Sequence, residues 1–113
     1  MITRKADHPV DVRTNMRGGN GDVHLAALMP QLPNKTRLFS TITLAPGCSI
    51  GVHEHTGETE LFYFASGSGR VYDDGEYYDV QAGDAMSTGS GHSHGVENTG
   101  SEDLVLVAVI ILD

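Results

Sequence analysis

Apolar and polar residues alternate along most of the chain after Arg37, which is the period-two pattern of half-buried strands. Asp73-Asp74-Gly75 separates two such segments, and Asp-Gly between β-forming residues is a strong hairpin signal. The predicted strands are 38–44, 59–65, 69–72, 76–80 and 104–112, with a further short strand beginning at Gly83-Asp84 and a turn at Gly89-Ser90-Gly91. Short strands at this spacing, without crossover helices, predict an all-β antiparallel fold, either a sandwich or a barrel.

The N-terminal third has a different pattern. Residues 17–21 are rich in glycine and indicate a loop or a bulged strand. Asp22–Met29 is the one helix candidate, since it could form a turn or two before Pro30 ends it. We therefore divide the single domain into an arm, 1–36, with a glycine-rich segment and this short helix, and a barrel, 37–113.

Length and charge narrow the function classes. The chain has 113 residues and a mass of 12.1 kDa, enough for one domain with one core. Its net charge of −8 disfavours contact with a nucleic-acid backbone or an anionic membrane. One cysteine excludes an internal disulfide and a zinc site of several thiolates. No signal peptide is visible and no apolar run reaches membrane-spanning length, so we expect a cytoplasmic protein.

Four of the six histidines fall into two close pairs, His53/His55 and His92/His94. On a strand, residues two apart point to the same face, so His53 and His55 are expected to lie side by side. Glu60 follows His55 by five residues and is expected to return on the neighbouring strand, facing the same way. Imidazoles and a carboxylate that converge inside a barrel make a site suited to a divalent transition metal.

These positions resemble the two sequence motifs of the cupins. The first motif has glycine, five residues, His-x-His, three or four residues, glutamate, six residues and glycine, and it matches Gly47, His53, His55, Glu60 and Gly67. The second has glycine, five residues, Pro-x-Gly, two residues, histidine, three residues and asparagine, and it matches Gly83, Gly91, His94 and Asn98. Gly89 replaces the proline, and either residue suits a tight turn. The spacer 68–82 agrees with small microbial cupins.

The resemblance implies a double-stranded β-helix, the RmlC-like jelly-roll or cupin barrel. It also implies one divalent ion (manganese, iron, cobalt, nickel or zinc) in a six-coordinate site with two positions left for water or substrate. The ligands that it implies are His53, His55, Glu60 and His94.

The sequence gives weaker indications of which residues surround this site. Phe62 and Phe64 share a strand face with Glu60 and are expected to form a dry wall of the pocket. His92, in the adjoining turn, is a further candidate pocket residue, and Glu58 is expected in solvent, from where it could reach the pocket rim. These two are the only candidates for an acid or base, and no catalytic residue is assigned.

The chain is similar to single-domain cupins of the oxalate-decarboxylase-like kind. Ile50, however, stands where oxalate decarboxylases usually carry an arginine that clamps a carboxylate, with Arg37 and Arg70 as candidate substitutes. The sequence therefore argues for a small carboxylate or hydroxy acid as ligand and against turnover of oxalate itself. The favoured hypothesis is a metal-dependent lyase, oxygenase or isomerase. The alternatives are a non-catalytic sensor module for a metal or small ligand and a sugar- or uronate-converting cupin.

The C-terminal run Leu104–Leu112 has nine successive apolar residues. They cannot all face a barrel interior, because alternate side chains of a strand point to opposite faces. The outward set needs cover from another sheet or chain, and cupins commonly supply it by dimerisation. We expect a homodimer.

Overall fold

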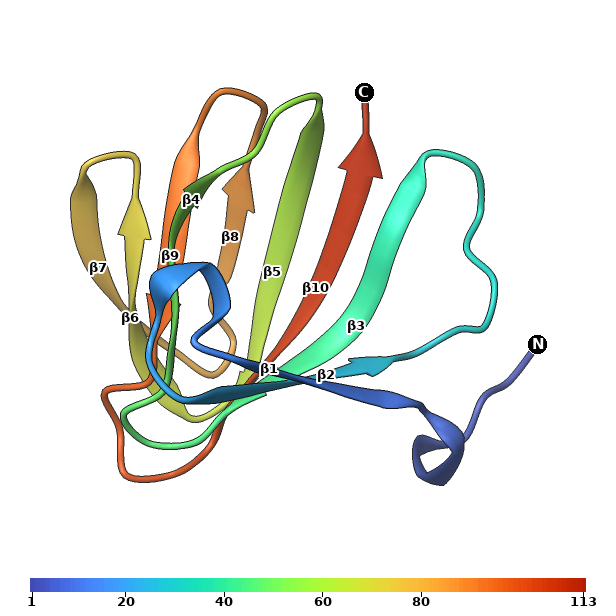
Figure 1. Ribbon diagram of the computed structural model, residues 1–113, viewed down its shortest axis with the longest axis horizontal. Helices are drawn as coiled ribbons and strands as arrows, with labels where there is room; N and C mark the ends of the chain where they lie inside the picture. The colour runs from blue at the N-terminus through green and yellow to red at the C-terminus, as the bar shows by residue number, and fades with distance from the viewer.

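The computed structural model describes residues 1–113 as ten strands and two three-residue 3-10 helices (Figure 1). The strands are β1 (Val10–Thr14), β2 (Asp22–Ala27), β3 (Thr36–Leu44), β4 (Ser49–Glu54), β5 (Glu58–Ser66), β6 (Ser68–Asp73), β7 (Glu76–Gln81), β8 (Ala85–Thr88), β9 (Ser93–Glu97) and β10 (Leu104–Leu112), and the helices are η1 (Lys5–Asp7) and η2 (Met16–Gly18). Neither helix has the length or the apolar character to cross a membrane.

The strands form two antiparallel sheets that face each other, as the jelly-roll prediction requires. The six-stranded sheet has the order β1-β2-β3-β10-β5-β8, and the four-stranded sheet has the order β4-β9-β6-β7. In Figure 1 the smaller sheet lies to the left and β5, β10 and β3 fan out to the right. The core between them includes the fully buried side chains of Val23, Leu44, Phe64, Leu104 and Leu106. The predicted all-β antiparallel fold is confirmed.

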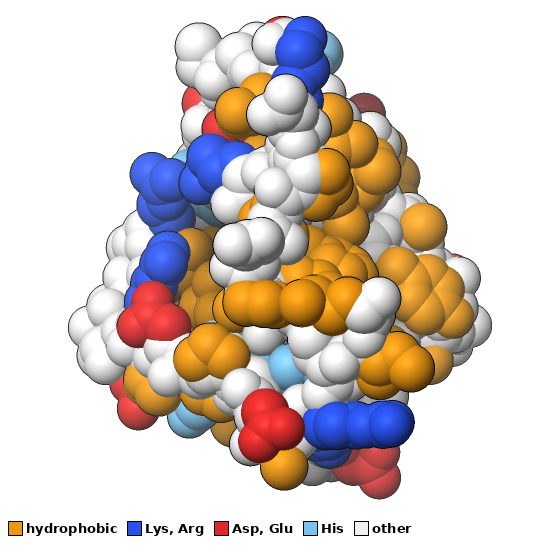
Figure 2. All heavy atoms as spheres, turned by 90° about the vertical axis from the view of Figure 1, so that its right-hand side faces the viewer, with side chains coloured by type: hydrophobic (Ala, Val, Ile, Leu, Met, Phe, Trp, Pro, Cys, Tyr) orange, Lys and Arg blue, Asp and Glu red, His pale blue; other side chains and the backbone are white.

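The strand β10 has the predicted bounds and lies in the middle of the larger sheet, between β3 and β5. From Leu104 to Ile111 its inward side chains are buried and its outward ones are partly or fully exposed, so burial alternates although every residue is apolar. Seen from the side of the molecule on which β3 lies, hydrophobic side chains gather across the middle of the surface (Figure 2).

The predicted hairpin joins β6 to β7. Asp73 pairs with Glu76, which leaves Asp74 and Gly75 as a two-residue loop. Their φ angles, 49° and 103°, are both positive, as a tight hairpin turn of this kind requires. The Asp-Gly signal therefore identified the hairpin, and the structure shows that the loop is one residue shorter than the separating segment Asp73-Asp74-Gly75.

The expected helix at Asp22–Met29 is wrong. Most of this segment is β2, which pairs with β1 on one side and β3 on the other. Val23 and Leu25 are buried while His24 is exposed, so the period of two decides its structure. The strands β1 and β2, both within the expected arm 1–36, extend the six-stranded sheet beyond β3.

The expectation that Glu60 returns on a strand next to the histidines is also wrong. The connection after β4 carries the chain into the other sheet, where β5 pairs with β10 and β8. The neighbour of β4 is β9, and their register is irregular between Ile50 and His53. Because such a bulge shifts the alternation by one residue, Ile50 and His53 both line the interior although they are three residues apart.

Candidate metal centre

Four side chains from both sheets converge at one end of the barrel interior. One ligand atom from each of His53, His55, Glu60 and His94 lies within 4.8 Å of the others. His53 and His94 are register partners on β4 and β9, His55 directly follows β4, and Glu60 reaches across from β5. His55, Glu60 and His94 are at most 6% exposed. The structure thus brings together the four residues that the motifs indicated.

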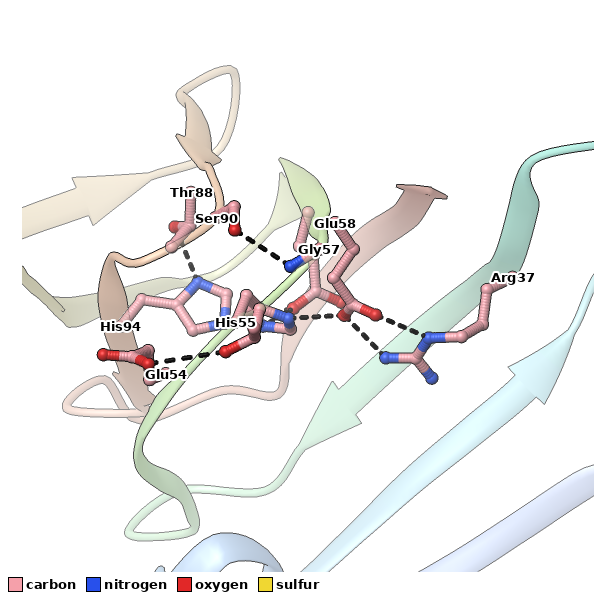
Figure 3. Close-up of polar contacts among 10 residues, drawn as sticks. Arg37, Glu54, His55, Gly57, Glu58, Thr88, Ser90 and His94 are labelled. Carbon is pink, nitrogen blue, oxygen red and sulfur yellow. Dashed lines mark hydrogen bonds and ion pairs between the residues drawn. The ribbon is translucent and has the colours of Figure 1, made fainter. Parts of the chain in front are cut away.

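Each imidazole is oriented by a partner at its Nδ1 atom. His53 Nδ1 lies 2.8 Å from the carbonyl of Gly51, which can only accept a hydrogen bond. His55 Nδ1 lies 2.6 Å from Glu58 Oε2, and His94 Nδ1 lies 2.8 Å from Thr88 Oγ1 (Figure 3). The Gly51 carbonyl and the Glu58 carboxylate favour a proton at Nδ1 of His53 and His55, which leaves their Nε2 lone pairs for the centre, and the Thr88 hydroxyl can accept from His94 Nδ1 in the same way.

In this tautomer the atoms at the centre are all hydrogen-bond acceptors. His55 Nε2 and His94 Nε2 are 2.9 Å apart, and Glu60 Oε1 lies 3.1 Å and 3.0 Å from them. Converging lone pairs and a carboxylate repel one another unless a cation lies between them. Burial holds the pKa of His53 below its ordinary value, which favours the neutral form that binds metals. The donor set therefore fits a divalent transition-metal ion.

Glu58 lies beside this cluster, although the sequence predicted it in solvent. It is 8% exposed, and its carboxylate accepts hydrogen bonds from Arg37 Nε at 2.9 Å and Arg37 Nη2 at 2.7 Å (Figure 3). The hydrogen bonds from Arg37 lower its pKa to about 2, with a smaller contribution from His55. Glu58 and Glu60 share the inward face of β5, so strand parity was the signal that could have identified it.

A cavity of about 80 Å³ opens beside the four side chains. Phe62 lines it, as expected, and its ring stacks on His94 with 4.9 Å between the centroids. Phe64 shares the inward face but lies fully buried in the core rather than in the cavity wall. Ile50 and Arg37 also line the cavity, whereas Arg70 pairs with Glu97 on the outside of the small sheet.

His92 does not reach the cavity. Its side chain is exposed in the turn before β9 and hydrogen-bonds the carboxylate of Asp74, which raises the pKa of His92. His92 precedes the first residue of β9, Ser93, so the strand alternation that points His94 inward does not extend to it.

Two further arginines, Arg13 and Arg17, reach the cavity from the N-terminal arm. Sequence reasoning missed both, because they lie far ahead of the histidine motif and no local pattern connects them to it. Only the folding of β1 and η2 across the barrel brings them to the site (Figure 1).

Comparison with known proteins agrees with this architecture. A family model described as a cupin domain matches residues 40–110. The chain is 44% identical over 114 residues to the oxalate-binding protein of Thermotoga maritima, covering 99% of this chain and 94% of that protein.

Two solved structures illustrate the range of similarity. The crystal structure of a predicted oxalate decarboxylase from Thermotoga maritima has a TM-score of 0.95 and 43% identity, with 100% of both chains covered. KdgF from a Halomonas species has a TM-score of 0.75 at 16% identity, covering 100% of this chain and 96% of that one, which is a likeness of fold alone. With the family model matched across the barrel and a relative at 44% identity along nearly the whole chain, this protein belongs to the cupin family.

Proposed function

We propose that this cupin binds one divalent transition-metal ion through His53, His55, Glu60 and His94, and uses it to bind a small dicarboxylate of the oxalate class. The observation that carries the proposal is that the metal-facing donor atoms and three arginines line the same small cavity. A divalent ion with free coordination positions binds a chelating carboxylate, and arginines add matching hydrogen-bond donors.

The size and charge of the cavity support a small anion. A volume of about 80 Å³ accommodates a group the size of a few water molecules, which suits a short acid better than a sugar ring. The chain has a net charge of −8, so long-range attraction does not favour an anion and the local cations must supply the affinity. The relative named oxalate-binding protein is consistent with this ligand class.

The polar contacts favour binding over turnover. Glu58, the nearest additional carboxylate, already accepts hydrogen bonds from Arg37 and His55. All three ligand imidazoles have partners at Nδ1. These groups are committed to holding the site together, and His92, the other candidate acid or base, points to solvent. We therefore place a metal-dependent binding protein ahead of the lyase, oxygenase or isomerase hypothesis.

The test compares metal-loaded and metal-free protein with a panel of acids and neutral sugars. Oxalate and related small acids are expected to raise the melting temperature of the manganese-loaded protein and leave the metal-free form unchanged. The Glu60→Ala variant, deprived of one metal ligand, is the control and should show no acid-dependent shift. Sugars that stabilise the loaded protein where acids do not would replace this proposal by the sugar-converting alternative. Consumption of oxalate in the same mixtures would show turnover and overturn the binding-only assignment.

A further inference from the structure

The three arginines of the cavity differ in whether they have a carboxylate partner. Arg13 Nε lies 2.9 Å from Asp11 Oδ2, and Arg37 is bound by both oxygens of Glu58. Arg17 makes no ion pair and no side-chain hydrogen bond, although it lines the cavity together with His53. Arg17 is therefore the cavity arginine whose charge and donors are left for a ligand.

The charges around the metal position then favour a dianion. Arg13 with Asp11 and Arg37 with Glu58 are neutral pairs. Glu60 cancels one of the two charges of a divalent ion, and Arg17 adds one positive charge. Two positive charges remain, which a dicarboxylate neutralises and a monocarboxylate does not. His55, Glu60 and His94 are buried, so water screens such a mismatch at the metal position only in part.

The backbone holds Arg17 in an unfavourable conformation. Its φ of 55° and ψ of 31° lie in the left-handed region, and Asn15 beside it has a φ of 53°. Residues other than glycine adopt this region at a cost, and such residues gather at functional sites. The turn is closed by Asn15, whose backbone N–H donates to the Gly21 carbonyl at 2.9 Å and whose side-chain oxygen accepts from Gly21 N–H at 3.1 Å.

The same turn is fixed against β4, the strand that carries His53. A Cβ at Gly51 would overlap the carbonyl of Arg17, and one at Gly19 would overlap the carbonyl of Ser49. The two backbones therefore touch, which only glycine at these positions allows. Asn20 adds a hydrogen bond from its side-chain nitrogen to the Gly47 carbonyl at 2.9 Å. The backbone of Arg17 is thus held at a defined place relative to His53, from which its side chain reaches the cavity.

We propose that Arg17 is the specificity-determining residue of this site: it binds the second carboxylate of a metal-bound dicarboxylate and so selects dianions over monoanions. This inference rests on the proposed function. The planar guanidinium matches a carboxylate with two parallel N–H donors. The metal ligands belong to the barrel and lie within the matched segment 40–110, whereas the selecting residue comes from the arm ahead of it.

The experiment uses manganese-loaded full-length protein and two ligands of equal carbon count, oxalate and glycolate, measured by titration calorimetry. Both chelate a metal, but oxalate carries one more negative charge. Arg17→Gln is expected to raise the dissociation constant of oxalate about tenfold or more, because a charge-assisted contact is lost, and that of glycolate less than about threefold. Arg17→Lys, which keeps the charge, should recover part of the oxalate affinity.

Two controls separate this role from a general loss of structure. Arg70→Gln removes an arginine on the outside of the small sheet and should leave both ligands unaffected. Manganese content is measured for each variant and should stay at that of the wild type.

The outcomes distinguish the inference from the proposed function. If the wild type binds oxalate and the Arg17→Gln variant binds it equally well, Arg17 does not select dianions and the proposed function stands. The same holds if Arg17→Gln weakens the binding of oxalate and of glycolate by the same factor. Equal oxalate affinities of Arg17→Lys and Arg17→Gln would likewise show that the charge of Arg17 does not contribute to selection. If the manganese-loaded wild type binds neither acid, the proposed function itself fails.

Discussion

At the scale of single residues, each histidine of the proposed metal site has a partner that orients its ring. Gly51, Glu58 and Thr88 each occupy the outward nitrogen of one imidazole and so decide which nitrogen faces the centre. Glu58 is the charged member of this group and is itself held by Arg37. The strongest effects of substitution are therefore expected at the ligands and at Glu58.

Purified protein is expected to hold about one divalent ion per chain, because four converging donors bind one ion. His55→Ala or Glu60→Ala should lose it, as measured by elemental analysis of protein prepared without added metal. His24→Ala, which removes an exposed imidazole on β2, is the matched control and should retain it. Full occupancy in a His55→Ala plus His94→Ala double variant would contradict the assignment.

Glu58→Gln is expected to weaken metal binding about 10- to 100-fold, because the amide no longer provides the charged acceptor that orients His55. Competition with a chelator of known affinity measures the change. Glu54→Gln, an exposed carboxylate close by in the sequence, serves as control and should have no effect. Equal metal affinity of the Glu58 variant and the wild type would show that this contact does not tune the site.

The pKa of Glu58, lowered by Arg37 from 4.5 to about 2, predicts a specific acid sensitivity of the metal-free protein. A carboxyl with a depressed pKa in the folded state stabilises it above the ordinary pKa, and this stabilisation disappears as the pH falls towards the folded value. The stability advantage of the wild type over Glu58→Gln should therefore be constant above pH 5 and shrink between about pH 4.5 and 2. Chemical unfolding at several pH values measures it, and a gap that persists at pH 2 would disprove this linkage.

At the scale of elements, strands with strong alternation or clear turn residues were predictable, and strands defined by distant partners were not. The Asp74-Gly75 loop and β10 followed from local sequence. The segment 22–29 ends in a run of helix-forming residues, and only pairing with β1 and β3 makes it a strand. Likewise, no feature of the local sequence predicts that the short connection after β4 crosses to the other sheet.

The residues of the candidate site likewise fall into a group that the sequence predicted and a group that it did not. The four proposed ligands follow a fixed spacing within two short segments, so the sequence indicated directly that they would lie together. The cavity arginines of the arm depend on a long-range approach of two backbones at Gly51, which a one-dimensional pattern does not contain. Burial of Glu58 was predictable from its parity with Glu60, but its charge favoured a solvent-exposed interpretation.

The contact between η2 and β4 gives a prediction for Gly51. A Cβ there would overlap the Arg17 carbonyl, so Gly51→Ala should displace the arm and destabilise the fold by about 1–3 kcal/mol. Thermal unfolding should show a melting temperature lower by several degrees. Gly89→Ala is the control, because its added Cβ meets no atom nearer than 3.8 Å. Equal melting temperatures for the two variants would show that the arm does not rest on Gly51 in solution.

At the scale of the whole molecule, the outer face of the larger sheet is apolar along its centre. On β10 the outward residues are Val105, Val107, Val109 and Ile111. The register places Leu61 of β5 beside Val109, and Tyr63 beside Val107, and the two β5 side chains are 39% and 51% exposed. A contiguous apolar strip of this kind at the middle of a sheet is typical of a surface that another chain covers.

We therefore expect a homodimer that buries this strip, with a mass of about 24 kDa, twice that of the chain, by light scattering. Tyr63→Glu places a charge within the strip and should shift the protein towards monomer, because an unpaired carboxylate is costly to bury. Tyr78→Glu is the matched control, since Tyr78 has a similar exposure of 50% but lies on β7 of the other sheet. A wild-type monomer of 12.1 kDa at micromolar concentration would disprove the dimer. A dimer that both variants leave intact would place the interface elsewhere and leave this apolar strip without a partner.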